Sequence, residues 1–313
     1  MTSVALGIDL GGTNCRGGLV DSSGCLLFRA EMETGAGVDF FPRFESFCHK
    51  VLTQATAAGL MLTHIGLGVP GVVDGLGRIL GAPNLPALHG VDLRQRLHGR
   101  FGFSVHVGND VDAIAAGEAR CGAGRGIDDF LVIALGTGVG GGLVLRRQVW
   151  RGSIASTAEI GHVIVVDGGR LGGCGHRGCL ETYASGPGLA HSIELARLGG
   201  EASHFKFPAI VTGPIVAAAA HAGDPVALAA FAEAGRHLGT VIASVLNLLG
   251  LSTVIFAGSG VANLDLMRST ILRSCSDALF PGTPLPQLLP AALGDDAGII
   301  GAALGAPGDD GLL

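Results

Sequence analysis

Short stretches in which apolar residues alternate with small or polar ones open the chain, and they predict three consecutive strands over residues 3–33. The sequence DSSG at 21–24 supplies turn-forming residues between the second and third strands. The pattern then predicts a helix, two strands and a second helix, at 39–60, 64–71, 105–110 and 111–124. Because strands and helices follow one another in this way, we expect an α/β fold.

The first strand, its glycine turn and the next strand have a counterpart at residues 128–152. Aligning Gly11 with Gly136 places GIDLGGTN (7–14) over VIALGTGV (132–139), with Asp9 opposite Ala134. An internal repeat of this kind predicts two similar α/β lobes with a ligand cleft between them. We expect the lobes to comprise residues 1–120 and 121–313.

The second lobe is predicted to continue with a helix that opens at Asp224 and Pro225, a strand at 252–261 and a last helix at 295–306. We expect the last helix to pack back on the N-terminal lobe and the tail at 307–313 to be loose. Residues 237–263 contain no Lys, Arg, Asp or Glu and are long enough to span a membrane. The sequence NLLGLS interrupts the stretch, so it predicts a buried helix followed by a buried strand, and no membrane association.

Composition narrows the class of protein. The 313 residues are 48% hydrophobic and only 15% charged, which is typical of a compact globular chain. The net charge of −6 argues against a nucleic-acid partner, and an odd count of seven cysteines does not suggest a disulfide framework. No basic segment precedes an apolar run at the N-terminus, so we expect a cytoplasmic protein with free thiols.

The two glycine turns predict phosphate binding. Residues 136–141, GTGVGG, match the pattern of a dinucleotide-binding turn, but a strand follows where that motif requires a helix. Glycine backbone N–H groups and a threonine hydroxyl can instead converge on an anion, and two such turns can hold a triphosphate. The carboxylate of Asp9 suits Mg²⁺ as a ligand, directly or through water. The structural alternative is a plain turn with a capping aspartate.

Seven motifs in order resemble the ROK family of sugar kinases, open reading frames and repressors. They are GIDLGGTN, GVPG, GNDVDAIAAGEA, GTGVGGG, EIGH, GCGHRGCLE and FAGSGV, and they cover nearly the whole chain. The segment APNLPALHGVDL (82–93) is similar to that of glucokinase-like members, with Ala87 where glycine is usual. The resemblance implies the two-lobed, actin-like sugar-kinase ATPase fold, built from duplicated ribonuclease-H-like lobes. The N-terminal lobe would then lie on the sugar and phosphate side, and the C-terminal lobe on the phosphate and adenosine side.

The same resemblance assigns roles residue by residue. Asp110 matches the family's general base. Residues that approach or hold the sugar are Gly71, Asn109, Asp110, Glu159, His162 and Glu181. Residues on the nucleotide side, with Asp9 for the cation, are Gly11, Gly12, Thr13, Gly136, Thr137, Gly138, Gly258 and Gly260. The implied cofactors and partners are ATP, Mg²⁺, a hexose and a second copy of the chain in a homodimer.

Chemistry supports the assignment of Asp110. A sugar hydroxyl is a poor nucleophile, and a carboxylate within hydrogen-bond distance can take its proton during attack on the γ-phosphate. Asp110 is predicted at a strand end just before a helix, which is a natural position for a site residue. Its nearest rival, Asp112, is expected to cap the helix or to face solvent. Structural alternatives exist for Asn109 as a turn former, Glu159 as a surface acid and His162 as a core histidine.

The sequence departs from the family at one metal site. The resemblance implies a structural Zn²⁺ held by the EIGH histidine and three cysteines, but Gly172 stands where the first cysteine is expected. His162, Cys174 and Cys179 remain, whereas structural zinc normally takes four protein ligands. Three possibilities stay open: zinc with three protein ligands and water, a substitute ligand such as His176, or no metal.

The resulting hypothesis is ATP-dependent phosphorylation of the 6-hydroxyl of glucose, in carbohydrate metabolism and glycolysis. Fructose, mannose and N-acetylmannosamine are alternative acceptors. A non-catalytic, sugar-sensing ROK protein is an alternative of another class. ROK repressors carry a helix-turn-helix domain before the DxGGT motif, and we expect no room for one before Asp9. A non-catalytic actin-like assembly ATPase is disfavoured by the sugar-pocket motifs.

Overall fold

The computed structural model describes residues 2–35, 39–74, 76–82, 85–152 and 157–305. Pro83 and Asn84 of the glucokinase-like segment, and the tail predicted to be loose at 307–313, lie outside the described residues.

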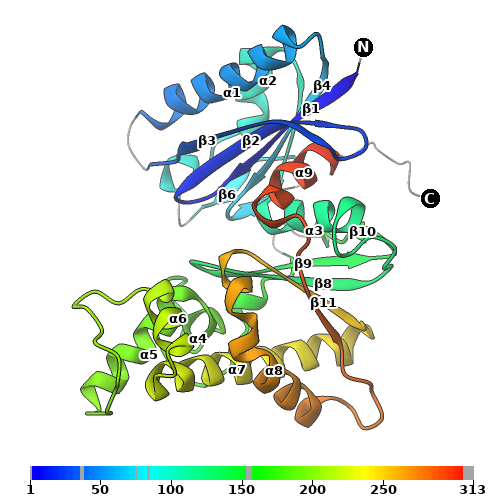
Figure 1. Ribbon diagram of the computed structural model, residues 1–313. Coiled ribbons are helices and arrows are strands. Elements are labelled where there is room, and N and C mark those ends of the chain that lie inside the picture. The colour runs from blue at the N-terminus through cyan, green and yellow to red at the C-terminus, as the bar shows by residue number, and fades with distance from the viewer. Residues whose placement is uncertain (1, 36–38, 75, 83–84, 153–156, 306–313) are drawn as a thin grey trace. The chain divides into compact units, whose positions relative to one another are not determined.

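The first sheet has the strand order β3-β2-β1-β4-β7 (Figure 1). Its strands are β1 (Ser3–Leu10), β2 (Asn14–Asp21), β3 (Leu26–Glu33), β4 (Met61–Val69) and β7 (Ser104–Asn109). The three predicted N-terminal strands form an antiparallel meander, and β4 and β7 continue the sheet in parallel. The elements around it are α1 (Phe40–Ala57), β5 (Val72–Val73), β6 (Ile79–Gly81), η1 (Pro86–Leu88), α2 (Leu93–Phe101), α3 (Asp110–Cys121), η4 (Gly294–Asp296) and α9 (Ala297–Leu304).

The second sheet has the order β10-β9-β8-β11-β12. Its strands are β8 (Phe130–Leu135), β9 (Val139–Leu145), β10 (Gln148–Val149), β11 (Thr253–Ala257) and β12 (Gln287–Pro290). Both sheets therefore place a three-strand meander beside strands that come later in the chain, which is the repeat that the two glycine turns predict. The remaining elements are η2 (Ile160–His162), α4 (Glu181–Ala184), α5 (Gly186–Leu198), α6 (Gly213–His221), α7 (Pro225–Leu249), η3 (Ser259–Asn263) and α8 (Leu264–Ala278).

Alternation along β1 sends side chains to two different helices. Leu6 and Ile8 are fully buried in a core shared with the phenylalanines of α1, whereas Ala5 belongs to a second cluster with residues of α9. The odd-numbered positions 5, 7 and 9 thus share the face that α9 covers. This alternation places the predicted ligand Asp9 beside the start of α9.

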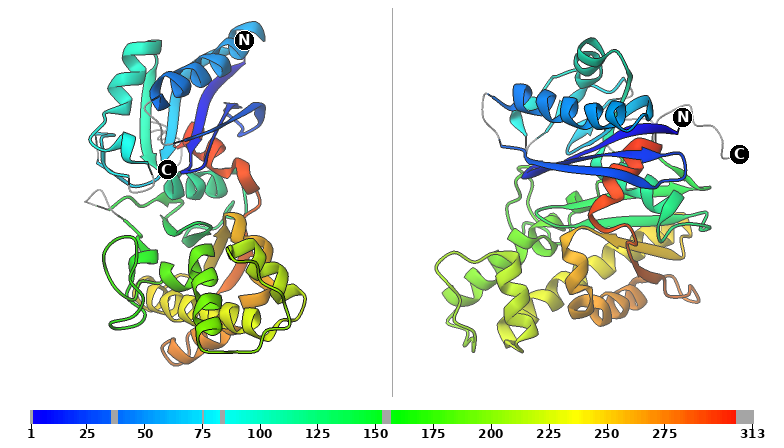
Figure 2. Two further views of the ribbon diagram at one scale, coloured as in Figure 1. Left: turned by 90° about the vertical axis from the view of Figure 1, so that its left-hand side faces the viewer. Right: turned by 45° about the horizontal axis from the view of Figure 1, so that its top comes forward.

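Glycines let α9 lie directly on the sheet and on α3, as the red helix beside the blue strands shows (Figures 1 and 2). A Cβ on Gly7 would lie 2.0 Å from the carbonyl oxygen of Ile299, and a Cβ on Gly66 would lie 1.8 Å from that of Ala302. At the crossing with α3, a Cβ on Gly301 would lie 1.6 Å from the carbonyl oxygen of Ala113. Such contacts exclude any side chain at these glycines.

The chain divides into two compact units. The first comprises residues 1–132, 142–157 and 291–313, and the second comprises 133–141 and 158–290. Helix α9 belongs to the first unit and packs against α3, β1 and β4. The predicted lobe boundary at 120 stays a prediction. The assignment of ligands to the two predicted lobes stays a prediction.

Two sequence predictions need correction at the level of elements. The strand predicted at 252–261 ends at Ala257, because Gly258 has φ +80° and begins the helical turn η3. Asp112 does not face solvent: it is only 9% exposed, and its carboxylate lies 3.8 Å from the guanidinium of Arg151. The helix predicted after Asp224 is confirmed as α7, with the Asp224 side chain accepting from the N–H of Ala227.

Within the described residues, no single helix has both the length and the apolar composition needed to cross a membrane. Helices α6 and α7 pass that test only as a pair, and they meet at a bend of 114°.

Candidate active site

The predicted base and its neighbour lie where β7 ends and α3 begins, in the first unit. Asn109 caps the helix: its side-chain oxygen accepts from the N–H groups of Val111 at 2.8 Å and Asp112 at 3.2 Å. Its amide nitrogen donates to the carbonyl oxygen of Gly71 at 3.2 Å. The structure therefore brings together Asn109 and Gly71, which the sequence analysis placed at the sugar, and it gives Asn109 its structural role as a cap as well.

Asp110 is the first residue of α3 and is half-buried. Its carboxylate accepts from the N–H of Val111 at 3.0 Å. A carboxylate in the first turn of a helix is stabilised by the partial positive charge of the unpaired N–H groups there. The position is therefore suited to a group that is ionised and able to accept a proton.

Asp9 is the second carboxylate of this region. Burial raises its pKa from the ordinary value of 3.8 to about 7, the negative charges of Asp110 and Asp295 add to the rise, and Arg16 opposes it. The guanidinium of Arg16 lies 3.9 Å from the Asp9 carboxylate and 3.4 Å from that of Asp295. Carboxylates gathered in this way are hard oxygen donors of the kind that Mg²⁺ takes.

The first glycine turn joins β1 and β2. The N–H of Gly11 donates to the carbonyl oxygen of Asn14 at 2.9 Å, and the carbonyl oxygen of Gly11 accepts from the buried hydroxyl of Thr34 at 2.7 Å. Gly12 and Thr13 are exposed at the tip of the turn. The turn is thus fixed at its base and open at its tip, which suits an anion ligand.

The second glycine turn lies in the second unit and is tied to α4 and α5. The N–H of Gly136 donates to the carbonyl oxygen of Gly138 at 3.0 Å, and the carbonyl oxygen of Gly136 accepts from the N–H of Gly186 at 2.9 Å. The Glu181 carboxylate accepts from the N–H of Val139 at 3.0 Å. A Cβ on Gly138 would lie 2.6 Å from that carboxylate, so only glycine leaves room for the contact.

A cavity of about 790 Å³ adjoins this turn within the second unit. Predicted nucleotide residues Gly136, Thr137 and Gly260 line it. Gly258 lies against Leu135, which lines the cavity, since a Cβ on Gly258 would lie 2.5 Å from the carbonyl oxygen of Leu135. A cavity of this size, largely apolar with a few polar groups at its wall, fits a nucleoside.

Sequence reasoning missed most of this wall. The starts of α5 and α6 contribute Gly186, Pro187, Gly213 and Pro214, and later positions add His191, Glu194, Phe231, Asn263 and Met267. Two Gly-Pro pairs, each at the beginning of a helix, were the available signal, since proline is favoured in the first turn.

The model of the ROK family matches residues 5–308 of the chain. This protein belongs to the ROK family. The glucokinase of Streptomyces coelicolor is 31% identical over 310 residues, which cover 96% of each chain.

Solved structures of the family agree with the fold. A ROK glucokinase from Streptomyces griseus, in complex with glucose and AMPPNP, matches with a TM-score of 0.79 and 34% identity, over 96% of this chain and 98% of that one. A ROK transcriptional regulator, a homologue of the E. coli MLC protein, matches with a TM-score of 0.87 and 26% identity, over 97% of this chain and 78% of that one. The actin-like, two-lobed α/β fold predicted from the motifs is thereby confirmed.

The ROK motif EIGH forms η2 and the residue before it. Glu159 and His162 are both partly exposed, and the His162 ring lies 4.0 Å from the Glu159 carboxylate. His162 is not the core histidine of the structural alternative, since its side chain is 41% exposed, whereas Glu159, with a side chain 37% exposed, remains compatible with a surface acid. With Glu181, the second unit therefore contains three of the predicted sugar residues, and the first contains Gly71, Asn109 and Asp110.

The donor atoms of His162, Cys174 and Cys179 lie within 4.8 Å of one another, and among the described residues they are the one such group of His, Cys, Asp or Glu. The two sulfur atoms are 3.6 Å apart, a separation that two ligands of one tetrahedral zinc can have. A Cβ on Gly172 would lie 3.4 Å from the Cys174 sulfur, so a cysteine there would have its side chain beside one member of the group. The residues present fit three of the four positions that structural zinc normally takes.

Proposed function

We propose that this ROK protein is an ATP-dependent hexose kinase that transfers the γ-phosphate of ATP to the 6-hydroxyl of glucose, with Asp110 as the general base. The observation that carries the proposal is Asp110 at the N-terminus of α3, held beside the cap Asn109, in a chain 34% identical to a glucokinase solved with glucose and AMPPNP. The general base needs an ionised carboxylate, and the helix N-terminus favours that form.

Each set of residues has a separate task in this proposal. Asn109 and the carbonyl of Gly71 orient the sugar next to Asp110, and Glu159, His162 and Glu181 hold other hydroxyls. The glycine turns at 11–13 and 136–138 bind the phosphates through backbone N–H groups, and the cavity of the second unit takes the adenosine. Asp110 accepts the proton of the 6-hydroxyl as that oxygen attacks the γ-phosphorus.

Mg²⁺ accompanies ATP in the proposal, and Asp9 would hold it, directly or through water. The ion would neutralise the charge of the phosphates during transfer. If zinc binds, His162, Cys174 and Cys179 would hold it, and a metal on one nitrogen of His162 would orient the other toward the sugar. We also propose a homodimer that acts in the cytoplasm, as the sequence analysis expects.

A panel of sugars tests the proposal. The purified protein is assayed with ATP and glucose, fructose, mannose or N-acetylmannosamine, with ADP production coupled to a spectrophotometric readout. We expect the highest kcat/KM with glucose. A higher kcat/KM with another hexose would show that this hexose, and not glucose, is the preferred substrate. The protein would still be a sugar kinase.

The alternative of another class is a sugar-sensing ROK protein without catalysis, which the similarity to a ROK transcriptional regulator favours. It predicts that glucose binds in calorimetry while no sugar gives ADP. That combination of results would reject the kinase.

A further inference from the structure

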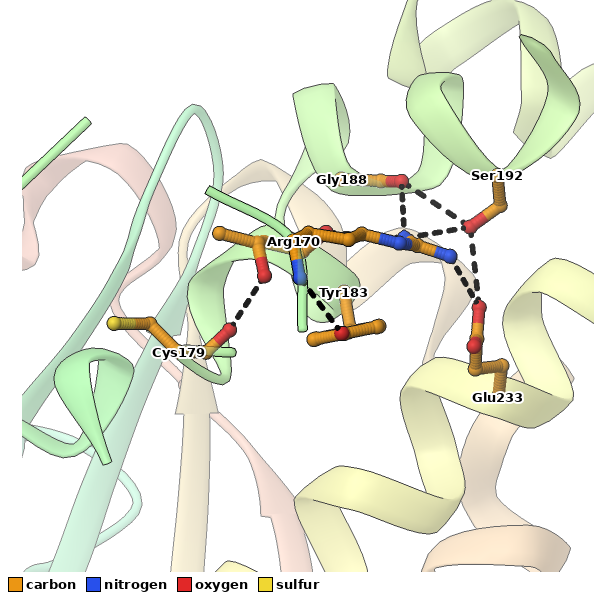
Figure 3. A network of polar contacts seen from close by, with 7 residues as sticks. Arg170, Cys179, Tyr183, Gly188, Ser192 and Glu233 are labelled. Carbon is orange, nitrogen blue, oxygen red and sulfur yellow. Dashed lines mark hydrogen bonds and ion pairs between the residues drawn. The ribbon is translucent and has the colours of Figure 1, made fainter. Parts of the chain in front are cut away.

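Arg170 is the centre of a polar network in the second unit (Figure 3). It belongs to the loop at 163–180, which joins η2 to α4 and contains Cys174 and Cys179. One guanidinium nitrogen of Arg170 donates to Glu233 at 2.8 Å, and the ion pair is well covered, with the Arg170 side chain 13% exposed. The guanidinium also stacks on the ring of Tyr183, 4.3 Å from its centre.

The second terminal nitrogen of the guanidinium, Nη1, contacts two helices. It donates to the carbonyl oxygens of Thr182 at 3.1 Å and Gly188 at 3.3 Å, and to the hydroxyl of Ser192 at 3.0 Å. Figure 3 shows Gly188 and Ser192 on one helix and Glu233 on another, both facing the Arg170 side chain. The planar guanidinium of Arg170, with several N–H donors, thus joins the loop to α4, α5 and α7 at once. The single ammonium group of a lysine could not reach all three helices.

The backbone of Arg170 is fixed as well. Its N–H donates to the hydroxyl of Tyr183 at 3.2 Å, and its carbonyl oxygen accepts from the N–H of Gly178 at 2.8 Å. The bond to Gly178 crosses the loop next to Cys179. The network therefore helps to place the cysteine part of the loop, together with the bond from the N–H of Val165 to the carbonyl oxygen of Gly178 at 2.8 Å.

The contacts lead directly to the proposed substrate residues. Thr182 follows Glu181, whose carboxylate accepts from Val139 in the glycine turn. Gly188 lies in the first turn of α5, whose start binds the carbonyl of Gly136 and lines the cavity. A displacement of Arg170 would therefore move the corner between α4 and α5 that carries Glu181.

We propose that the Arg170–Glu233 ion pair, rather than a metal ion, holds the 163–180 loop in place, and that Arg170 is thereby a positioning residue for Glu181. The reason is the ligand count: Gly172 leaves three donors where a closed zinc site has four, so the loop needs another attachment. Arg170 supplies one that involves no metal. The effect on sugar binding rests on the proposed function, whereas the effect on the loop does not.

Hydrogen exchange of the backbone, measured by mass spectrometry on the full chain, tests the proposal without an activity assay. In the wild type we expect exchange at 163–185 to be the same before and after metal is removed with a chelator. Arg170→Met should raise exchange there about 10- to 100-fold, since it removes the ion pair with Glu233 and the bonds to Thr182, Gly188 and Ser192, and leaves Glu233 with the longer bond from the Ser192 hydroxyl at 3.3 Å. Glu233→Gln is the milder second variant, and it should raise exchange in the same segment if Arg170→Met fails to fold.

Arg177→Met is the matched control, because Arg177 lies in the same loop and its side chain, within the described residues, donates to the carbonyl oxygen of Gly169 alone, at 3.2 Å. In Arg177→Met, hydrogen exchange at residues 163–185 should stay at the wild-type level. Two results would overturn the proposal: a wild-type loop that opens when the chelator is added, or a loop in Arg170→Met and Glu233→Gln that exchanges no faster than in the control.

Kinetics supply the second readout. If the protein phosphorylates glucose, Glu233→Gln should raise the KM for glucose about 10-fold or more while kcat falls less, as expected of a residue that acts through another. A fall in kcat with KM unchanged would contradict a positioning role. If no sugar is phosphorylated by the wild type, the proposed function fails and the exchange experiment still decides the role of Arg170.

Discussion

The Glu181 carboxylate and the backbone N–H of Val139 are joined by a hydrogen bond of 3.0 Å. The resemblance to the ROK family implies that Glu181 contacts the sugar and that the turn before Val139 binds the phosphates. The bond connects the two within one unit, so a change at Glu181 can affect both substrates.

Substitution of Glu181 should therefore depend on the replacement. Glu181→Ala removes the acceptor of the Val139 N–H and should raise the KM for both glucose and ATP. Glu181→Gln keeps an acceptor oxygen and should raise mainly the KM for glucose, by about 10-fold, because a charge-assisted hydrogen bond becomes a neutral one. Steady-state kinetics of the two variants provide the check; equal effects on the KM for ATP would show that the bond does not support the turn.

Binding of Mg²⁺ should depend on pH through Asp9. Its pKa of about 7 lies above the ordinary 3.8, so the carboxylate is protonated below pH 7 and ionised above it. Because the ion needs the ionised form, the apparent dissociation constant for Mg²⁺ should rise about 10-fold per pH unit below pH 7. Titration of the free protein with Mg²⁺ between pH 5.5 and about 8.5 measures this.

Substitution of two charged neighbours, Arg16 and Asp295, should shift the pKa of Asp9 in opposite directions. Arg16 lowers its pKa and Asp295 raises it, so Arg16→Gln should move the transition to higher pH and Asp295→Asn to lower pH. Shifts in the same direction would exclude Asp9 as the titrating group. The stability of the fold should change with pH in the opposite direction to Mg²⁺ binding. The folded state binds the proton of Asp9 more tightly than the unfolded chain does. The free energy of unfolding of the metal-free protein should therefore decrease as the pH rises from 3.8 to about 7.

The contact between α9 and α3 should be intolerant of side chains. A Cβ on Gly301 would lie 1.6 Å from the carbonyl oxygen of Ala113, so Gly301→Ala should lower the free energy of unfolding by about 3 kcal/mol or more. The control is Gly99→Ala in α2, where nothing lies within 4 Å of the added Cβ. Gly99→Ala should raise the free energy of unfolding by about 0.5–1 kcal/mol, because alanine is the better helix former. Urea unfolding of both variants distinguishes packing from a general effect of adding a methyl group.

Zinc content should respond to position 172. We expect the wild type to retain well below one equivalent of zinc after dialysis against a weak chelator, because three protein ligands leave the site open. Gly172→Cys should retain one equivalent, since the new side chain starts 3.4 Å from the Cys174 sulfur. Elemental analysis of the two proteins is the measurement, and a full equivalent in the wild type would show that three ligands, or an additional one, suffice.

Part of the order of elements could be predicted, because those elements depend on local pattern, whereas α2, α4, α5, α6, α8 and β12 were not predicted. Alternation indicated β1, β2 and β3, Asp224 with Pro225 indicated the start of α7, and the two glycine turns indicated the repeated sheet order. Motif resemblance then identified the family.

Long-range packing was not predictable in the same way. The burial of Asp112 depends on Arg151, and the network of Arg170 depends on Glu233, 63 residues further along the chain. Neither partner is marked by any local pattern. The cavity wall likewise combines the starts of α5 and α6 with η3, which only the folded chain brings together.

The most direct test of the account is the turnover of Asp110→Asn. This change removes the proton acceptor and keeps the shape of the side chain at the start of α3. With glucose and ATP we expect kcat to fall by about 10²- to 10⁴-fold, the range for loss of a general base, while the dissociation constant for glucose, measured by calorimetry, changes less than about 3-fold. A variant that turns over glucose at the wild-type rate would contradict the assignment of Asp110 as the base.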